Sequence, residues 1–275
     1  MKKNTIPVFK SEFSVGKSVL TLEKDDGGKE PKSIFSLYKD YLAPKGSEAK
    51  PPLFLVDDCL DGAIKAYENA GALKIPLRMG IRMDICDCRF STDAEVKNST
   101  HKIILFIKNL QGYTDLCRLW TTAALLTIED RKPSCILDNK MLREGFTNNL
   151  SIAIPFYDSF IYNNNFTLRN CIPQFPMIAQ GGSKEPTPVI PTFFIEDHDL
   201  PFDDMLRTDV LRSRDTLFPN SPVIETHTIY YEKRNHFKKY LVRRCIDESS
   251  CIEKPEIPHM CSDRFNLEDL CQKQI

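Results

Sequence analysis

The sequence predicts an α/β protein built on a parallel sheet or an α/β barrel. Short apolar runs of strand length, such as 52–56 and 102–107, alternate with stretches whose apolar residues recur at helical spacing. The first of these runs leads directly into Asp57 and Asp58. An apolar run that ends in polar side chains is typical of a buried parallel strand whose carboxyl end faces a site.

The same patterns define the elements in chain order. Ser33 is expected to cap a helix whose apolar residues are Ile34, Leu37, Tyr38 and Leu42. Further helices are expected over 62–72, 112–126, 201–212 and 233–245. Strands are expected over 6–22 (with a turn), 52–56, 76–85, 102–107, 149–155, 192–196 and 223–226. This alternation favours a single α/β domain over 1–275, with loop-rich insertions near 23–32, 43–51 and 179–190.

Composition excludes several classes of protein. The 275 residues are 41% hydrophobic and 10% aromatic, which is enough for a substantial core. The 37 basic and 38 acidic residues nearly cancel, so no global positive field attracts nucleic acid. No apolar run approaches the roughly 20 residues of a membrane span, and the first residues lack the apolar stretch of a signal peptide. We therefore expect a cytoplasmic protein without a membrane partner.

The cysteines are expected to be reduced thiols, since the chain is long and several of them lie in apolar runs. Two groups offer an alternative as zinc ligands. One is Cys86 and Cys88 beside Asp84, and the other comprises Cys245, Cys251, His259, Cys261 and Cys271. Neither group has the paired Cys-x2–4-Cys spacing of structural zinc sites, so core packing is the favoured role.

A series of segments then resembles one known family in order and spacing. These segments are Val8–Ser14, Leu55–Cys59, Gly62–Tyr67, Gly80–Arg82, His101–Tyr113, Glu196–Pro201, Thr226–Tyr230 and Arg264–Leu267. They resemble the PHP (polymerase and histidinol phosphatase) domain, in the form that opens the alpha subunit of bacterial DNA polymerase III. The resemblance covers nearly the whole chain and implies a distorted (βα)7 barrel.

The resemblance also implies that the family's chemistry is lost. PHP enzymes hold a metal cluster with His and carboxylate side chains and use it to hydrolyse phosphoesters. Carried over to this chain, the ligand positions are Val8, Lys10, Lys17, Asp58, Arg82, His227 and Ile229. Ammonium and guanidinium groups cannot bind a metal ion. We therefore expect a pocket without metal or other cofactor, in which Lys10 and Arg82 are neutralised by Asp57 and Asp58.

This pattern predicts a catalytically degenerate, stand-alone PHP-like domain that acts as a protein-interaction or structural module. In the polymerase family the domain also serves as a docking surface for other replication subunits. The resemblance therefore implies a partner from DNA replication or repair. An eroded site in a separately encoded domain suggests a fast-evolving genome, such as that of a virus of bacteria.

Two other functions stay open. The first is a metal-dependent phosphoesterase or nuclease with relocated ligands, binding a divalent metal such as Zn or Mn. Its ligands would be Asp57, Asp58, His101, His198 and His227, although His198 also fits a loop histidine held by acidic neighbours. Gly16-Lys17-Ser18 is only weakly phosphate-loop-like, because Ser11 stands where that motif begins with glycine or alanine.

The second is nucleic-acid binding by the basic segment 233–244. Its basic residues are Lys233, Arg234, Lys238, Lys239, Arg243 and Arg244. Aromatic residues interleave with them, as in surfaces that meet phosphates and bases. The competing interpretation is an amphipathic helix that buries Phe237, Tyr240, Leu241 and Cys245 and leaves the basic residues in water. His236 and His259 are expected to be surface residues.

Overall fold

The computed structural model describes residues 5–14, 18–43, 50–88, 99–125, 135–171, 173–178, 187–247, 249–252 and 262–273. Lys17, His259 and Cys261 lie outside these ranges, as do most of the insertions predicted at 43–51 and 179–190.

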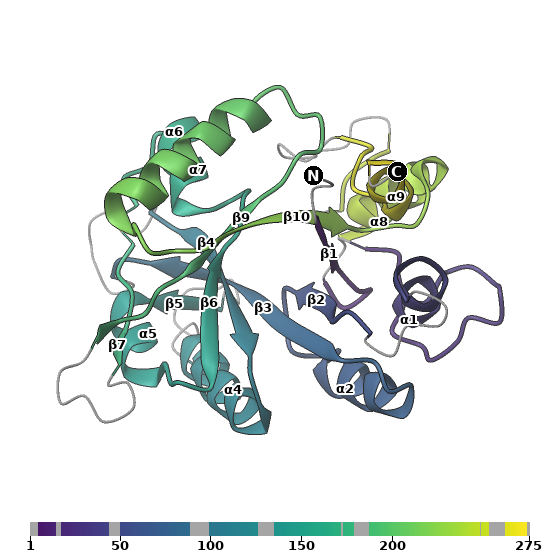
Figure 1. Cartoon of the computed structure of the whole chain (residues 1–275), viewed down its shortest axis with the longest axis horizontal. Coiled ribbons are helices and arrows are strands. Elements are labelled where there is room, and N and C mark those ends of the chain that lie inside the picture. Colours follow the sequence, from purple (N-terminus) through teal and green to yellow (C-terminus); the bar gives the residue numbers. More distant parts are fainter. Residues whose placement is uncertain are drawn as a thin grey trace. The chain divides into compact units, whose positions relative to one another are not determined.

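Figure 1 shows the strands and helices of the described residues. The strands are β1 (Ile6–Phe9), β2 (Leu53–Asp57), β3 (Leu77–Cys86), β4 (His101–Ile107), β5 (Ile136–Asp138), β6 (Leu150–Ile154), β7 (Met177–Ile178), β8 (Thr187–Pro188), β9 (Thr192–Ile195) and β10 (Val223–Ile229). The helices are α1 (Ile34–Leu37), the π-helical turn η1 (Tyr38–Leu42), α2 (Ala63–Ala72), α4 (Leu110–Leu125), α5 (Asn139–Gly145), α6 (Phe160–Phe166), α7 (Asp203–Leu217), the 3-10 helix η2 (Arg234–His236), α8 (Phe237–Asp247) and α9 (Leu267–Lys273).

The α/β class is confirmed, and the main sheet forms a barrel. Its strands follow the order β2-β1-β10-β9-β6-β4-β3-β5, and β2 also pairs with β3, which closes the ring. β1 runs parallel to β2 and β10, and β6 runs parallel to β9. β4 and β6 are antiparallel, so the sheet is mixed rather than wholly parallel.

The chain divides into two compact units. Unit 1 comprises Met1–Ile81, Glu196–Asp203 and Glu225–Ile275. Unit 2 comprises Arg82–Ile195 and Asp204–Ile224.

The core of unit 1 forms where β1, β2 and β10 meet α1, α2 and α9. Phe9, Leu55 and Ile229 belong to one buried cluster with residues of these helices. Ser33 caps α1 as expected, because its hydroxyl accepts a hydrogen bond from the backbone N–H of Phe35. The same cluster contains Ala66 and Ala70 of α2, whose small side chains allow the helix to approach the strands closely.

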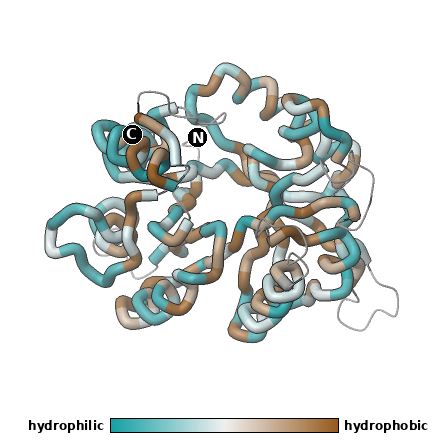
Figure 2. The backbone as a smooth tube through the Cα atoms, turned by 180° about the vertical axis from the view of Figure 1, so that it is seen from behind, coloured by the Kyte–Doolittle hydropathy of each residue, from teal (hydrophilic) through white to brown (hydrophobic). Residues whose placement is uncertain are grey.

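In unit 2, α4 packs against β4, β5, β6 and α5. Gly112 allows this close approach, because a Cβ atom at that position would lie 2.4 Å from the backbone oxygen of Asn149. Figure 2 shows hydrophobic residues along many of the strands and on parts of the helices, while hydrophilic residues dominate the connecting loops. Within the described ranges, no helix combines the length and the apolar composition that crossing a membrane requires.

The sequence analysis did not predict several short elements. α5 and α6 each cover one or two turns and are capped by Asp138 and Ser159, whose side chains accept hydrogen bonds from Met141 and Tyr162 N–H groups. α9, β5 and the β7–β8 pair were also not predicted. Elements this short have too few residues for a visible periodicity. The predicted 233–245 helix is instead η2 followed by α8, and the predicted 6–22 strand is limited to β1.

Candidate functional site

Asp57 is the most completely hydrogen-bonded of the candidate site residues. It ends β2, is fully buried, and accepts hydrogen bonds from the Ser11 backbone N–H (2.8 Å), the Ser11 hydroxyl (2.6 Å) and the Ser14 hydroxyl (2.8 Å). Burial raises the pKa of Asp57, against the opposing effect of these donors and of Lys10. Both carboxylate oxygens are therefore engaged in holding the turn that follows β1.

Asp58 forms an ion pair with Lys10. The Lys10 ammonium nitrogen lies 3.1 Å from the Asp58 carboxylate, and the two side chains are 3% and 13% exposed. The Asp58 backbone N–H also donates to the Ser14 hydroxyl at 3.2 Å. An ammonium group thus lies beside a carboxylate at two of the positions where the PHP resemblance implies metal ligands.

His198 and His227 belong to a buried network in unit 1. His198 Nε2 lies 2.7 Å from the Glu196 carboxylate, and the His198 ring stacks on Phe265 with the ring centroids 3.7 Å apart. His227 Nε2 lies 2.9 Å from the Asn266 carbonyl oxygen, so this nitrogen is the donor. Both histidines are at most 2% exposed, so neither imidazole reaches solvent.

Glu196 connects this network to β10. Its carboxylate accepts from both the backbone N–H and the hydroxyl of Thr228, each at 3.0 Å. Burial acts to raise the pKa of Glu196, but the hydrogen bond and charge of His198, together with Thr228, leave it lowered. Sequence analysis missed Glu196 and Thr228. The sequence signal that could have identified Glu196 is its position two residues before His198, at the end of a predicted strand.

The strand register separates residues that the PHP resemblance assigns to one site. Val8 pairs with Thr228, and Phe9 pairs with Ile229. Paired residues share a face and successive residues alternate, so Val8 and Thr228 lie on one face of the sheet. His227 and Ile229 lie on the other face, where Ile229 is part of the buried apolar cluster. The β10 residue that shares a face with Val8 is therefore Thr228.

In unit 2, Arg82 is paired within its own unit. Its guanidinium forms an ion pair with Asp158, and Lys102 forms another with Asp84 at 2.8 Å. The sequence had offered Asp57 and Asp58 as the acidic partners of Arg82. Asp158, which was not singled out, is a partner of Arg82 in the structure.

His101 begins β4 and is buried, with only 3% of its surface exposed. Its Nδ1 lies 3.4 Å from the Ser99 carbonyl oxygen, and its ring meets Phe160 edge-on. Desolvation lowers the pKa of His101 to about 4. The imidazole is therefore neutral at physiological pH and enclosed by protein.

We expect His101 to weaken the fold as the pH falls. The unfolded chain takes up the proton near the ordinary pKa of 6.5 and the folded chain only near 4. Stability is therefore complete above pH 6.5 and falls between 6.5 and 4, by about 2 kcal/mol between pH 7 and pH 5. Urea unfolding of wild type and His101→Phe across this range measures the effect. The variant should lose less stability on acidification, and identical pH profiles would contradict this assignment.

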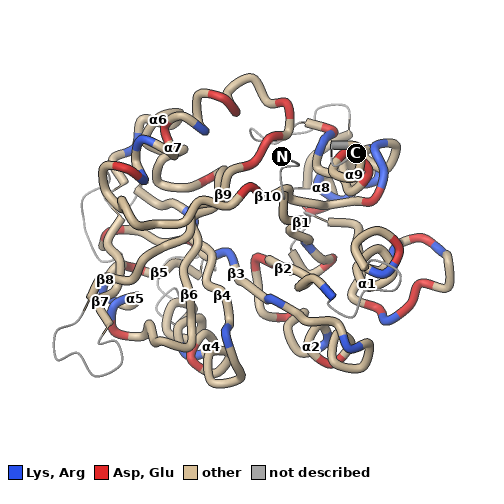
Figure 3. The backbone as a smooth tube through the Cα atoms, viewed as in Figure 1, with Lys and Arg blue, Asp and Glu red and all other residues tan. Residues whose placement is uncertain are grey.

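The basic segment is partly neutralised and partly buried. Figure 3 shows Lys and Arg along α8 with acidic residues nearby. Arg234 forms a bidentate ion pair with Asp263, and Lys239 pairs with Glu30 at 3.2 Å. Arg244 is buried, as are Tyr240 and Cys245, whereas Lys233, Lys238 and Arg243 are exposed. This arrangement agrees with the amphipathic-helix interpretation at Tyr240 and Cys245, while the burial of Arg244 departs from it.

The cysteines in the described ranges carry free thiols. Cys86 is buried while Cys88 is exposed. Burial raises the pKa of Cys59 to about 11, and its thiol donates to the Phe13 carbonyl oxygen. Such a thiol is unreactive at neutral pH. The second candidate zinc group depends on His259 and Cys261, which lie outside the described residues.

Among the described residues, the structure brings together one group of three metal-ligating side chains: Glu30, Glu232 and His236. None of the five residues proposed as relocated ligands belongs to it. No protein-family model matches the chain. No curated protein matches it either. The PHP resemblance therefore stays a prediction from the sequence.

Proposed function

We propose that the protein is a catalytically inactive, PHP-like barrel that acts as a binding module for a protein of DNA replication or repair. The observation that supports the absence of catalytic activity is the Lys10–Asp58 ion pair at 3.1 Å. A lysine ammonium beside the carboxylate repels a metal cation and occupies one of its oxygens. The replication partner rests on the sequence resemblance alone.

The hydrogen bonds of the other candidate ligands support the same proposal. Asp57 holds the Ser11–Ser14 turn, and His227 donates to the Asn266 carbonyl. A metal ion would have to break these buried interactions before it could bind. The relocated-ligand hydrolase is therefore the weaker alternative, and it needs Asp58 to exchange Lys10 for a metal ion.

One experiment tests both parts of the proposal, the binding partner and the loss of hydrolase activity. The tagged protein is captured from cells of its source together with bound proteins, and the same preparation is assayed for hydrolysis of single-stranded DNA with Mn²⁺ or Zn²⁺. We expect replication or repair proteins among the captured partners and no hydrolysis above that of Asp58→Asn. Asp58→Asn is the preferred control because it alters the ion pair and leaves the Asp57 hydrogen bonds in place.

Two results would overturn the proposal. Metal-dependent cleavage that Asp58→Asn abolishes, in a variant whose melting temperature stays well above the assay temperature, would restore the hydrolase. Salt-sensitive DNA binding that Arg243→Glu removes would favour the basic segment instead. Arg243 is the suitable residue for this reversal because it is exposed, whereas Arg244 is buried and its reversal would disturb the fold.

A further inference from the structure

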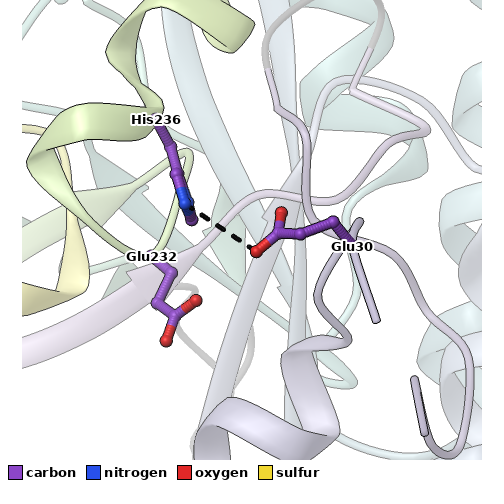
Figure 4. Close-up of side chains that lie close together, drawn as sticks. All are labelled: Glu30, Glu232 and His236. Atoms are coloured by element: carbon purple, nitrogen blue, oxygen red, sulfur yellow. Dashed lines mark ion pairs between the residues drawn. The ribbon is translucent and has the colours of Figure 1, made fainter. Parts of the chain in front are cut away.

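A group of metal-ligating side chains lies in unit 1 away from the positions that the sequence resemblance identifies. Figure 4 shows Glu30, Glu232 and His236 lying close together, with the ion pair between His236 and Glu30 marked. One potential ligand atom from each residue lies within 4.8 Å of the other two. Glu30 comes from the 23–32 loop, Glu232 lies two residues before η2, and His236 is the last residue of η2.

Glu232 is the residue that points to a bound cation. It is only 6% exposed, and its hydrogen bond comes from the neutral Tyr41 hydroxyl at 3.2 Å. Among the described residues, no lysine or arginine forms an ion pair with it. Burying a carboxylate costs several kcal/mol unless a cation or metal compensates. His236 belongs to the same group of side chains, and a neutral imidazole is a common metal ligand.

Glu30 completes the group from the solvent side. Its carboxylate lies 3.8 Å from His236 Nε2 through one oxygen and 3.2 Å from the Lys239 ammonium through the other. The Glu30 side chain is 43% exposed. Around a metal ion with bonds of about 2.1 Å, ligand atoms stand about 3.4 Å apart. The three ligand atoms lie within 4.8 Å of one another, so binding would draw them together by at most about 1.4 Å.

We propose that Glu30, Glu232 and His236 bind a divalent transition-metal ion of the zinc class. One imidazole nitrogen and two carboxylate oxygens suit Zn²⁺ better than Mg²⁺ or Ca²⁺, which prefer ligand sets made of oxygen alone. The Tyr41 hydroxyl orients the Glu232 carboxylate, as outer-shell donors do at metal sites. Three protein ligands leave a coordination position for water or for a group from a partner.

The proposal also assigns a role to Lys239. Its ammonium group neutralises Glu30 when no metal is bound and competes with the metal for that carboxylate. Removing this charge should therefore tighten metal binding, while removing a ligand should weaken it. These opposite signs distinguish a metal site from a chance gathering of charged side chains.

Cobalt is the probe that separates this site from the cysteines. The full-length protein is freed of metal with a chelator and titrated with Co²⁺, followed by absorbance. We expect one Co²⁺ per chain with the d–d bands of nitrogen and oxygen ligands and without a thiolate charge-transfer band. Excess Zn²⁺ added afterwards should displace it, because Zn²⁺ favours four-coordinate sites of nitrogen and oxygen ligands.

Three variants and one matched control test the ligands. Glu232→Gln and His236→Gln should each weaken Co²⁺ binding by at least about tenfold. Lys239→Met should strengthen it by roughly threefold. Glu68→Gln changes an exposed glutamate of α2 and should leave the affinity unchanged. The melting temperature of each chelated variant shows that it is folded, and His236→Gln changes a half-buried surface residue, so it should keep the fold.

Other outcomes would overturn the proposal. They are the absence of Co²⁺ binding, a thiolate band, or an affinity that Glu232→Gln and His236→Gln leave unchanged. The result is independent of the proposed function, because Glu30, Glu232 and His236 are not among the ligand positions that the PHP resemblance implies. DNA cleavage that depends on Asp58 would contradict the proposal of a catalytically inactive barrel, but it would not affect the proposed metal site.

Discussion

Asp57→Ala is expected to lower the free energy of unfolding by about 3–4 kcal/mol. The substitution leaves three donors without their acceptor: the Ser11 N–H and hydroxyl and the Ser14 hydroxyl. A hydrogen bond to a charged group contributes about 1.5–3 kcal/mol, and the three losses overlap because they share one carboxylate. Asp57→Asn keeps one carbonyl acceptor and should lose less.

Urea unfolding measures this effect directly. The matched control is Asp40→Ala, because Asp40 is an exposed aspartate of η1 in the same unit. Its loss should stay within about 0.5 kcal/mol. An Asp57→Ala protein as stable as Asp40→Ala would show that the carboxylate does not hold the turn. The same reasoning makes Asp57→Ala unsuitable as an activity test, since a lost signal would report on folding.

The buried strands were the part of the fold that the sequence could predict. β2, β3 and β4 are runs of mostly apolar residues, and each coincides with the predicted strand to within one residue at either end. α5 and α6 were not predictable from periodicity, because seven residues present less than two full repeats of a helical face. Their signals are the caps, Asp138 and Ser159, and a short side chain before a polar stretch also fits a turn.

Predicting the candidate site requires two structural properties that cannot be read from a single sequence. The first is the face of each strand residue: a shift of a single residue between aligned motifs moves every side chain to the opposite face. His227 and Ile229 were matched by motif, whereas the register places Thr228 beside Val8. The second is proximity between distant segments, which brings Glu30 to His236 and Asp158 to Arg82.

Lys10→Met is expected to destabilise the protein by about 3 kcal/mol through the loss of its ion pair with Asp58. Both side chains are largely buried, at 3% and 13% exposure, so water cannot replace the missing ammonium group. Removing one partner of a buried pair costs about 3–5 kcal/mol, and the remaining exposure of Asp58 argues for the lower end. Asp58→Asn alone should also destabilise, because it removes the carboxylate that pairs with the Lys10 ammonium group at 3.1 Å.

The double variant Lys10→Met/Asp58→Asn measures the coupling energy between the two residues, as distinct from the effect of each residue alone. With both charges of the pair removed, neither leaves the other behind, but Asp57 loses the favourable charge of Lys10, so stability should recover most rather than all of the loss. The coupling energy from urea unfolding should then be about 2–3 kcal/mol and nearly independent of salt, because the pair is shielded from solvent. Additive losses would mean that the two residues act separately. The claim that an ion pair has replaced a metal ion would then lose its physical basis, since Lys10 would not compensate Asp58.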